Sequence, residues 1–101
     1  MATAKVTIKR ADNEIAVFVN GILAYDKKTE GDPALNDVVD ISGFLQRGCC
    51  NSVVIIGINW GGVAHYEGSL TVDTSTTAWA FQAASTPNGM VFHESFTIPG
   101  P

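Results

Sequence analysis

The chain has 101 residues, of which 46% are hydrophobic and 16% are charged, and its formal net charge is −4. This length fits one domain, and six scattered Lys and Arg residues exclude a basic surface for nucleic acid or for an anionic membrane. No apolar stretch approaches the roughly 20 residues of a membrane-spanning helix. The first twenty residues alternate rather than form an apolar block, so we expect a protein that is cytoplasmic or is released without a cleaved signal peptide.

The N-terminal part of the sequence predicts two strands and a hairpin. Residues 4–9 alternate between aliphatic and polar side chains, which is typical of a strand with one exposed face. Residues 14–19 form a second strand, and Asn20-Gly21 after it favours a two-residue type I′ turn because both residues tolerate positive φ. Such a turn pairs Val19 with Ile22, Phe18 with Leu23 and Ala16 with Tyr25. Both faces of this hairpin are apolar, so we expect it to be covered on both sides.

The next part of the chain is more polar. Residues 27–36 predict a surface loop, and a short strand follows at residues 38–41. One helical turn is expected near residues 42–47, capped by Ser42 and ended by Gly48. The two cysteines, at positions 49 and 50, are neighbours, and neighbouring cysteines rarely bond to each other. They are either two free thiols in a reducing compartment or partners in an intermolecular disulfide.

The central segment is the most apolar part of the sequence. Residues 53–58 form a nearly continuous run rich in β-branched side chains, which predicts a strand covered on both faces. Trp60 ends the run, Gly61-Gly62 bends the chain, and residues 69–73 return as a strand with one wet face. We therefore expect a loop between the two strands, with aromatic side chains on it.

The C-terminal third predicts two further strands, at residues 77–83 and 90–98, separated by a turn that contains Pro87 and a second Asn-Gly pair. Glu94 falls on an otherwise apolar side of the last strand, where a carboxylate needs a partner, a bulge or a function. Altogether the chain predicts about eight short strands and no helix longer than one turn. The expected fold is all-β, a two-sheet antiparallel β-sandwich in a single domain that spans residues 1–101.

The order of these parts resembles the galactose-binding-domain-like β-sandwich, a jelly-roll family that includes many carbohydrate-binding modules and small lectins. The residues that carry the resemblance are Asp12 to Glu14, Phe18 to Gly21, Asp40 to Leu45, Gly48, Asn51, and Asn59 to Gly62, with Trp79, Phe92, Phe96 and Ile98 in the closing strands. The resemblance implies a jelly-roll-like fold and carbohydrate binding. The two cysteines depart from the family's pattern, and the short chain without a catalytic neighbour favours a free-standing lectin or an assembly subunit.

The sequence offers no catalytic constellation. His65 and His93 lie far apart without metal-ligand spacing, and no nucleophile elbow or phosphate-binding glycine loop is present. A pairing of Cys49 with a histidine rests on residue type alone. Oxygen ligands suited to calcium occur at Asp12, Asn13, Glu14 and Asp40, but ordinary turn chemistry explains the first three. We therefore predict that the protein is not an enzyme and has no metal or other cofactor.

Carbohydrate binding has a recognisable signature, namely an aromatic ring for the C–H face of a sugar beside amides and carboxylates for its hydroxyl groups. The candidate ligand-binding residues are Asn59, Trp60, His65, Tyr66 and Glu67, with Trp79 and Tyr25 from neighbouring segments. The alternative for Trp60 is a core position at the end of a buried strand. We predict a non-catalytic, lectin-like domain that binds glycans as a homo-oligomer. The alternative is a structural subunit of a phage particle or protein lattice that self-associates through its sheet faces.

Overall fold

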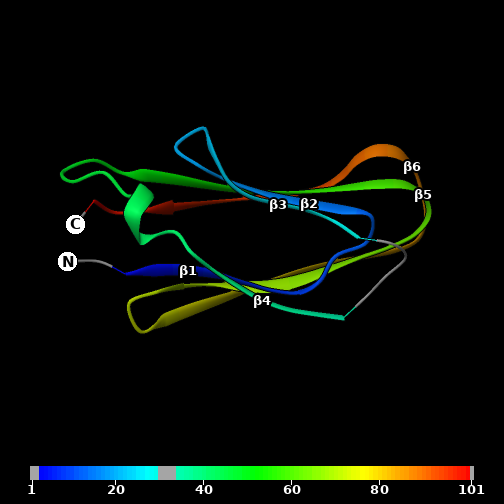
Figure 1. Cartoon of the computed structure of the whole chain (residues 1–101), viewed down its shortest axis with the longest axis horizontal. Coiled ribbons are helices and arrows are strands. Elements are labelled where there is room, and N and C mark those ends of the chain that lie inside the picture. The colour runs from blue at the N-terminus through cyan, green and yellow to red at the C-terminus, as the bar shows by residue number, and fades with distance from the viewer. Residues whose placement is uncertain (1–2, 30–33, 101) are drawn as a thin grey trace.

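The computed structural model describes residues 3–29 and 34–100, and these residues are almost entirely β-structure (Figure 1). The elements are β1 (Ala4–Arg10), β2 (Glu14–Val19), β3 (Ile22–Lys28), β4 (Ala34–Asp40), a 3₁₀ turn η1 (Ser42–Phe44), β5 (Asn51–Val72) and β6 (Ser75–Ile98). Strands account for 78% of the structure. The predicted all-β class is confirmed.

The strands form one antiparallel sheet that folds over on itself. Its order is β3-β2-β5-β1-β4, and β6 pairs with β5 along both halves of that strand. The first half of β5 pairs with β2, and the second half pairs with β1. Figure 1 shows the resulting two layers, which are joined at the end of the molecule where β5 and β6 turn. The sheet therefore curls into a half-barrel with one core between its layers.

The prediction of about eight strands in two sheets is not confirmed, because six strands are found. Residues 53–58 and 69–73 are predicted as separate strands, but residues 53–58 and 69–72 both lie within the single strand β5. In the same way, segments 77–83 and 90–98 are both parts of β6. The ladder between β5 and β6 continues through the bend with two register shifts, and such bulges bend a strand without ending it.

The bend in β5 depends on two glycines and one buried amide. Gly61 and Gly62 have φ values of 95° and 78°, a region that favours glycine. Asn59 is fully buried, and its Nδ2 lies 3.3 Å from the carbonyl oxygen of Gly61 and 3.2 Å from that of Val63. The same nitrogen donates to Thr86 Oγ1 on β6 at 2.6 Å. The predicted Gly-Gly bend is confirmed, but it lies within a continuous strand rather than in a loop.

The core fills the space between the two layers with aliphatic and aromatic side chains. Phe92 is central to its aromatic part, because its ring centroid lies 5.7 to 5.8 Å from those of Tyr66, Trp79 and Phe81. Tyr66, from one half of β5, packs over Gly57 in the other half, where an added Cβ would lie 2.7 Å from the tyrosine ring. Contact between the layers therefore requires glycine at that position.

The N-terminal hairpin forms at the predicted turn, and both of its turn residues have positive φ, 53° and 79°. The first two predicted cross-strand pairs are confirmed. The third is wrong, because Ala16 lies opposite Asp26 rather than Tyr25. A register shift between Val17 and Phe18 displaces the partner strand by one residue beyond that point.

The segment between β3 and β5 differs from the prediction in three ways. Residues 27–36 are not all loop, since β3 continues through Lys28 and β4 begins at Ala34, while residues 30–33 lie outside the described part. The helical turn is confirmed but ends at Phe44. Ser42 does not cap it; instead the Ser42 N–H donates to Asp40 Oδ1 at 2.9 Å.

Candidate functional site

Two of the predicted ligand-binding aromatic residues belong to the core. Tyr66 is 0% exposed and Trp79 is 4% exposed. The Tyr66 hydroxyl lies 2.5 Å from the carbonyl oxygen of Asp12 and 2.7 Å from that of Ile58, and it ties the β1–β2 connection to β5. Neither ring has a face available for stacking on a ligand.

Asn59 and Tyr25 also have structural roles. Asn59 holds the bend from within the core, as described above. The Tyr25 hydroxyl donates to the Asp37 carboxylate, and Lys27 Nζ lies 3.1 Å from the same carboxylate. Burial and this contact raise the pKa of Tyr25, and the hydrogen bonds from Tyr25 and Lys27 lower the pKa of Asp37. β3 and β4 stand at the two ends of the strand order, and the gap between them is the open side of the half-barrel. This cluster links the two strands across that side.

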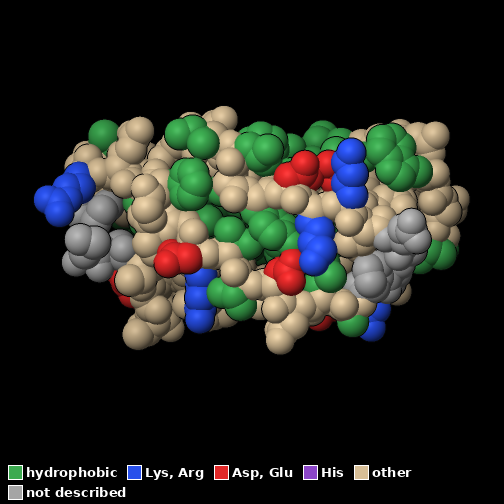
Figure 2. Space-filling model, viewed as in Figure 1, with side chains coloured by type: hydrophobic (Ala, Val, Ile, Leu, Met, Phe, Trp, Pro, Cys, Tyr) green, Lys and Arg blue, Asp and Glu red, His purple; other side chains and the backbone are tan. Residues whose placement is uncertain are grey.

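Figure 2 shows this open side, where hydrophobic side chains are visible in the hollow between the two layers, with acidic and basic side chains beside them. The Tyr25–Asp37–Lys27 contact joins β3 and β4, the strands at the two ends of the strand order.

His65 and Glu67 lie on the opposite layer from Trp60. After the bend, even-numbered residues of β5 are buried, so these two odd-numbered side chains point outward. His65 Nε2 lies 3.3 Å from Glu67 Oε1, and both side chains are only partly buried. Before the bend the even-numbered residues point outward, among them Trp60. The structure does not bring the predicted imidazole and carboxylate to the indole.

Trp60 is 61% exposed, and the core alternative for this residue is wrong. Its backbone N–H donates to Asn13 Oδ1 at 2.9 Å, which fixes the strand just before the glycines. Asn88 of β6 lies directly opposite Trp60, and its side chain reaches the position of a Cβ on Gly61 at 3.2 Å. Glu14 pairs with Ile58, so it is a diagonal neighbour of Trp60 on the same outer surface.

Sequence reasoning missed Asn88 and Glu14 as neighbours of the indole. The sequence predicts a turn at Asn88 and the start of a strand at Glu14, and neither prediction places these residues beside Trp60. Their proximity follows from the register of β5 with β6 and with β2, which the sequence does not state. The sequence does show that Asn88 belongs to an Asn-Gly turn and that Glu14 follows an Asp-Asn turn. A polar side chain at such a turn is the signal that points to these two residues.

Glu14 is one of a pair of carboxyl groups at the edge of this surface. A hydrogen bond with Asp26 raises the pKa of Glu14, burial and the negative charge of Asp26 raise it further, and Lys28 opposes the shift. Lys28 lies opposite Glu14 in the β2–β3 ladder, and Asp26 lies opposite Ala16. The neighbouring carboxyl group therefore holds the pKa of Glu14 above its ordinary value.

The sheet surface next to Trp60 is apolar. We call it the apolar outer face, and its members are Phe18, Leu23, Val54, Ile56, Ile58, Trp60 and Met90, from β2, β3, β5 and β6. Leu23 and Met90 are 51% and 59% exposed. Figure 2 shows hydrophobic side chains along the upper rim of the molecule, over β2, β3 and β5. The prediction that these strands are covered on both faces is wrong, because the described chain covers only their inner face.

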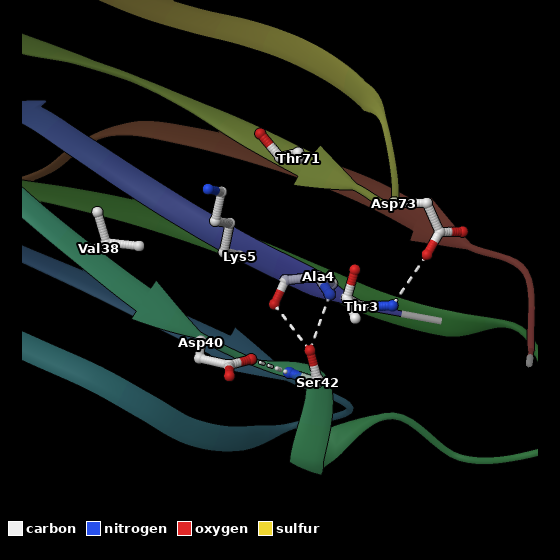
Figure 3. A pocket seen from close by; sticks show the side chains of 8 residues that line it. All are labelled: Thr3, Ala4, Lys5, Val38, Asp40, Ser42, Thr71 and Asp73. Atoms are coloured by element: carbon white, nitrogen blue, oxygen red, sulfur yellow. Dashed lines mark hydrogen bonds between the residues drawn. The ribbon is translucent and has the colours of Figure 1, made fainter. Parts of the chain in front are cut away.

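A pocket of about 360 Å³ lies at the far end of the other layer, between β1, β4 and the end of β5 (Figure 3). Its lining residues are Thr3, Ala4, Lys5, Val38, Asp40, Ser42, Thr71 and Asp73. Asp40 and Asp73 accept hydrogen bonds from the backbone N–H groups of Ser42 and Thr3, and the first of these bonds lowers the pKa of Asp40. These carboxylates therefore serve to order the ends of the strands.

The described residues contain no cluster of three or more His, Cys, Asp or Glu side chains that could hold a metal ion. Asp40 pairs with Lys5 at the start of β1, whereas Asp12 follows the end of β1, so these two calcium candidates lie at opposite ends of a strand. Cys49 and Cys50 are exposed free thiols.

Comparison of the chain with protein-family models, with characterised proteins and with solved structures gives no match. Within the described segments, no helix is long and apolar enough to cross a membrane. The geometry of the Trp60 surface is therefore the basis for a functional proposal.

Proposed function

We propose that the protein is a non-catalytic, lectin-like domain that binds carbohydrate on the Trp60 side chain. The observation that carries this proposal is an indole that is 61% exposed on a bend held by hydrogen bonds from the Asn59 and Asn13 side chains. A large aromatic ring that points into solvent leaves apolar area uncovered, and a sugar presents a C–H face of matching shape. Because the backbone under the ring is already ordered, binding costs little conformational entropy there.

Polar groups beside the indole supply the second half of the site. The Asn88 amide, directly opposite Trp60, donates to and accepts from hydroxyl groups. Glu14, on the diagonal, offers carboxyl oxygens that accept hydrogen bonds from hydroxyl groups. This set replaces the predicted His65 and Glu67, which point outward from the other layer, and Tyr66, which lies in the core.

The proposal includes the jelly-roll-like sandwich that the resemblance to galactose-binding domains implies. It is supported by antiparallel strands that face each other across one core, and by the Asn-Gly hairpin and the short helical turn at the expected positions. A single small site of this kind binds weakly, so a homo-oligomer that engages several sugars at once would gain avidity.

A glycan array tests the proposal. We expect the wild-type protein to bind galactose-type or fucose-type sugars, and Trp60→Ala to lose at least about fivefold in affinity, if a sugar ring stacks on the indole about as strongly as a nucleic-acid base stacks on an aromatic side chain, which contributes roughly 1 to 3 kcal/mol. Leu23→Ala is the matched control, because it removes exposed apolar area from the far side of the same face and leaves the indole intact. Equal binding by wild type and Trp60→Ala, or no binding to any glycan, contradicts the proposal.

The second candidate is an assembly subunit, and the apolar outer face favours it. A contiguous set of half-buried and exposed aliphatic side chains is typical of a surface that another protein covers. Large ordered assemblies in light scattering, combined with no glycan binding, would favour this function over the lectin.

A further inference from the structure

The outer edge of β6 is the longest unpaired strand edge in the described structure. β6 runs for 24 residues and pairs with β5 alone. Most of its side chains are exposed, even at positions such as Thr77 that point toward the core side. A free edge presents a row of backbone N–H and C=O groups that are ready to pair with another strand.

The other two edges of the sheet carry features that protect them. β3 contains three consecutive charged residues, 26–28, and its Tyr25 and Lys27 bind Asp37 of β4. β4 also ends in Asp40. Charged side chains on an edge oppose pairing with another strand because they repel and remain hydrated. β6 contains no Lys or Arg and only one acidic residue, Glu94.

The two arms of β6 differ in the same respect. Antiparallel pairing of residues 90–98 with a second copy about Glu94 would place two carboxylates opposite each other, which is unfavourable. Residues 75–83, with the sequence STTAWAFQA, carry no charge and are rich in Thr, aromatic and small side chains. This composition favours strand pairing.

We propose that residues 75–83 of β6 pair antiparallel with the same residues of a second copy of this chain. A two-fold axis through Trp79 places Ala78 opposite Ala80 on the outer face and Thr77 opposite Phe81 on the inner face. Because that axis is perpendicular to the sheet, both cores remain on the same side. The exposed Thr77 and the half-buried Phe81 are then covered at the junction. The result is one continuous sheet across two half-barrels.

Substitutions on the exposed outer face test this dimer. The double variant Ala78→Lys, Ala80→Lys places lysines directly opposite lysines of the partner, and like charges in that position oppose pairing. Both alanines are exposed, so the monomer fold is preserved. The matched control is Ser95→Lys, Thr97→Lys, which adds two lysines to exposed outer positions of the other arm.

Analytical ultracentrifugation of the full chain, from about 10 to about 500 µM, measures the association because dimerisation follows mass action. We expect wild type and control to form dimers. The dissociation constant of the Ala78/Ala80 variant should be at least about tenfold higher than that of wild type. Circular dichroism verifies that all three are folded. A wild type that stays monomeric throughout, an unchanged dimer in the Ala78/Ala80 variant, or dissociation by the control contradicts the proposal.

Amide hydrogen exchange gives an independent readout. Every second N–H in residues 75–83 points away from β5, and these amides exchange more slowly as protein concentration rises if the edges pair. Exchange rates that do not depend on concentration contradict the dimer. Neither measurement involves a sugar, so the dimer and the glycan site are tested separately.

Discussion

The two halves of β5 present opposite kinds of surface to solvent. Before the bend its outward side chains are Val54, Ile56, Ile58 and Trp60, and after the bend they are His65, Glu67, Ser69 and Thr71. The inward set switches from odd to even residue numbers between Asn59 and Ala64, where the second register shift and two positive-φ glycines lie. One strand therefore contributes to an apolar outer face and to a polar one, and the bend decides which residues go where.

This difference shows what an apolar run means in a strand. A run without alternation indicates that both faces are shielded from water, yet the described chain shields only the inner face of residues 53–58. The outer face is thus available for a ligand or a protein partner. In the second half of β5, buried apolar residues alternate with partly exposed polar ones. The composition of this half therefore implies no further partner.

The largest expected effect comes from removing the amide that holds the bend. Asn59→Leu keeps the side-chain size but leaves partly buried carbonyl groups of the bend, and Thr86 Oγ1 on β6, without their donor. We expect a loss of about 2 to 3 kcal/mol in the free energy of unfolding, measured with urea. Asn36→Leu, at an exposed position on β4, is the control and should change stability by less than about 0.5 kcal/mol. Equal stability of the two variants would show that the bend does not depend on Asn59.

A smaller effect is expected from Ile56→Thr on the apolar outer face. Ile56 is only half-buried, so replacing it with a polar side chain should cost about 1 kcal/mol or less. The same substitution at Ile55, which is 0% exposed, should cost about 2 kcal/mol more because it buries a hydroxyl group in the core. Urea unfolding of the dilute monomer compares the two. Equal losses would mean that the outer face is covered as fully as the inner one.

The smallest effect is a pH dependence at the polar edge of the apolar outer face. The hydrogen bond with Asp26 raises the pKa of Glu14 above its ordinary value of 4.5, so the folded state binds this proton more tightly than the unfolded state. The contribution to stability is complete below pH 4.5 and is lost as the pH rises through the higher folded pKa. We expect Glu14→Gln to flatten the stability profile in that window. A stability profile identical to that of wild type would contradict this contribution of Glu14.

The sequence predicted most of the local structure and little of the site. The Asn-Gly hairpin and the Gly-Gly bend follow from backbone preferences of those residues, and both are present. The residues grouped around Trp60 in sequence are separated in space, because strand neighbours point to opposite sides of a sheet. Glu14 and Asn88, which do lie beside the indole, are distant in sequence and meet it only through strand register.

Taken alone, the sequence determined the all-β class, the turns and the bend, since these depend on side-chain branching and on φ preferences within a few residues. Only the tertiary structure decided that β5 and β6 run unbroken through the bend, that Tyr66 and Trp79 lie inside and Trp60 outside, and that one sheet face and one strand edge are left uncovered. Those outcomes depend on hydrogen-bond register and on packing between the layers, and both are set by contacts between distant residues.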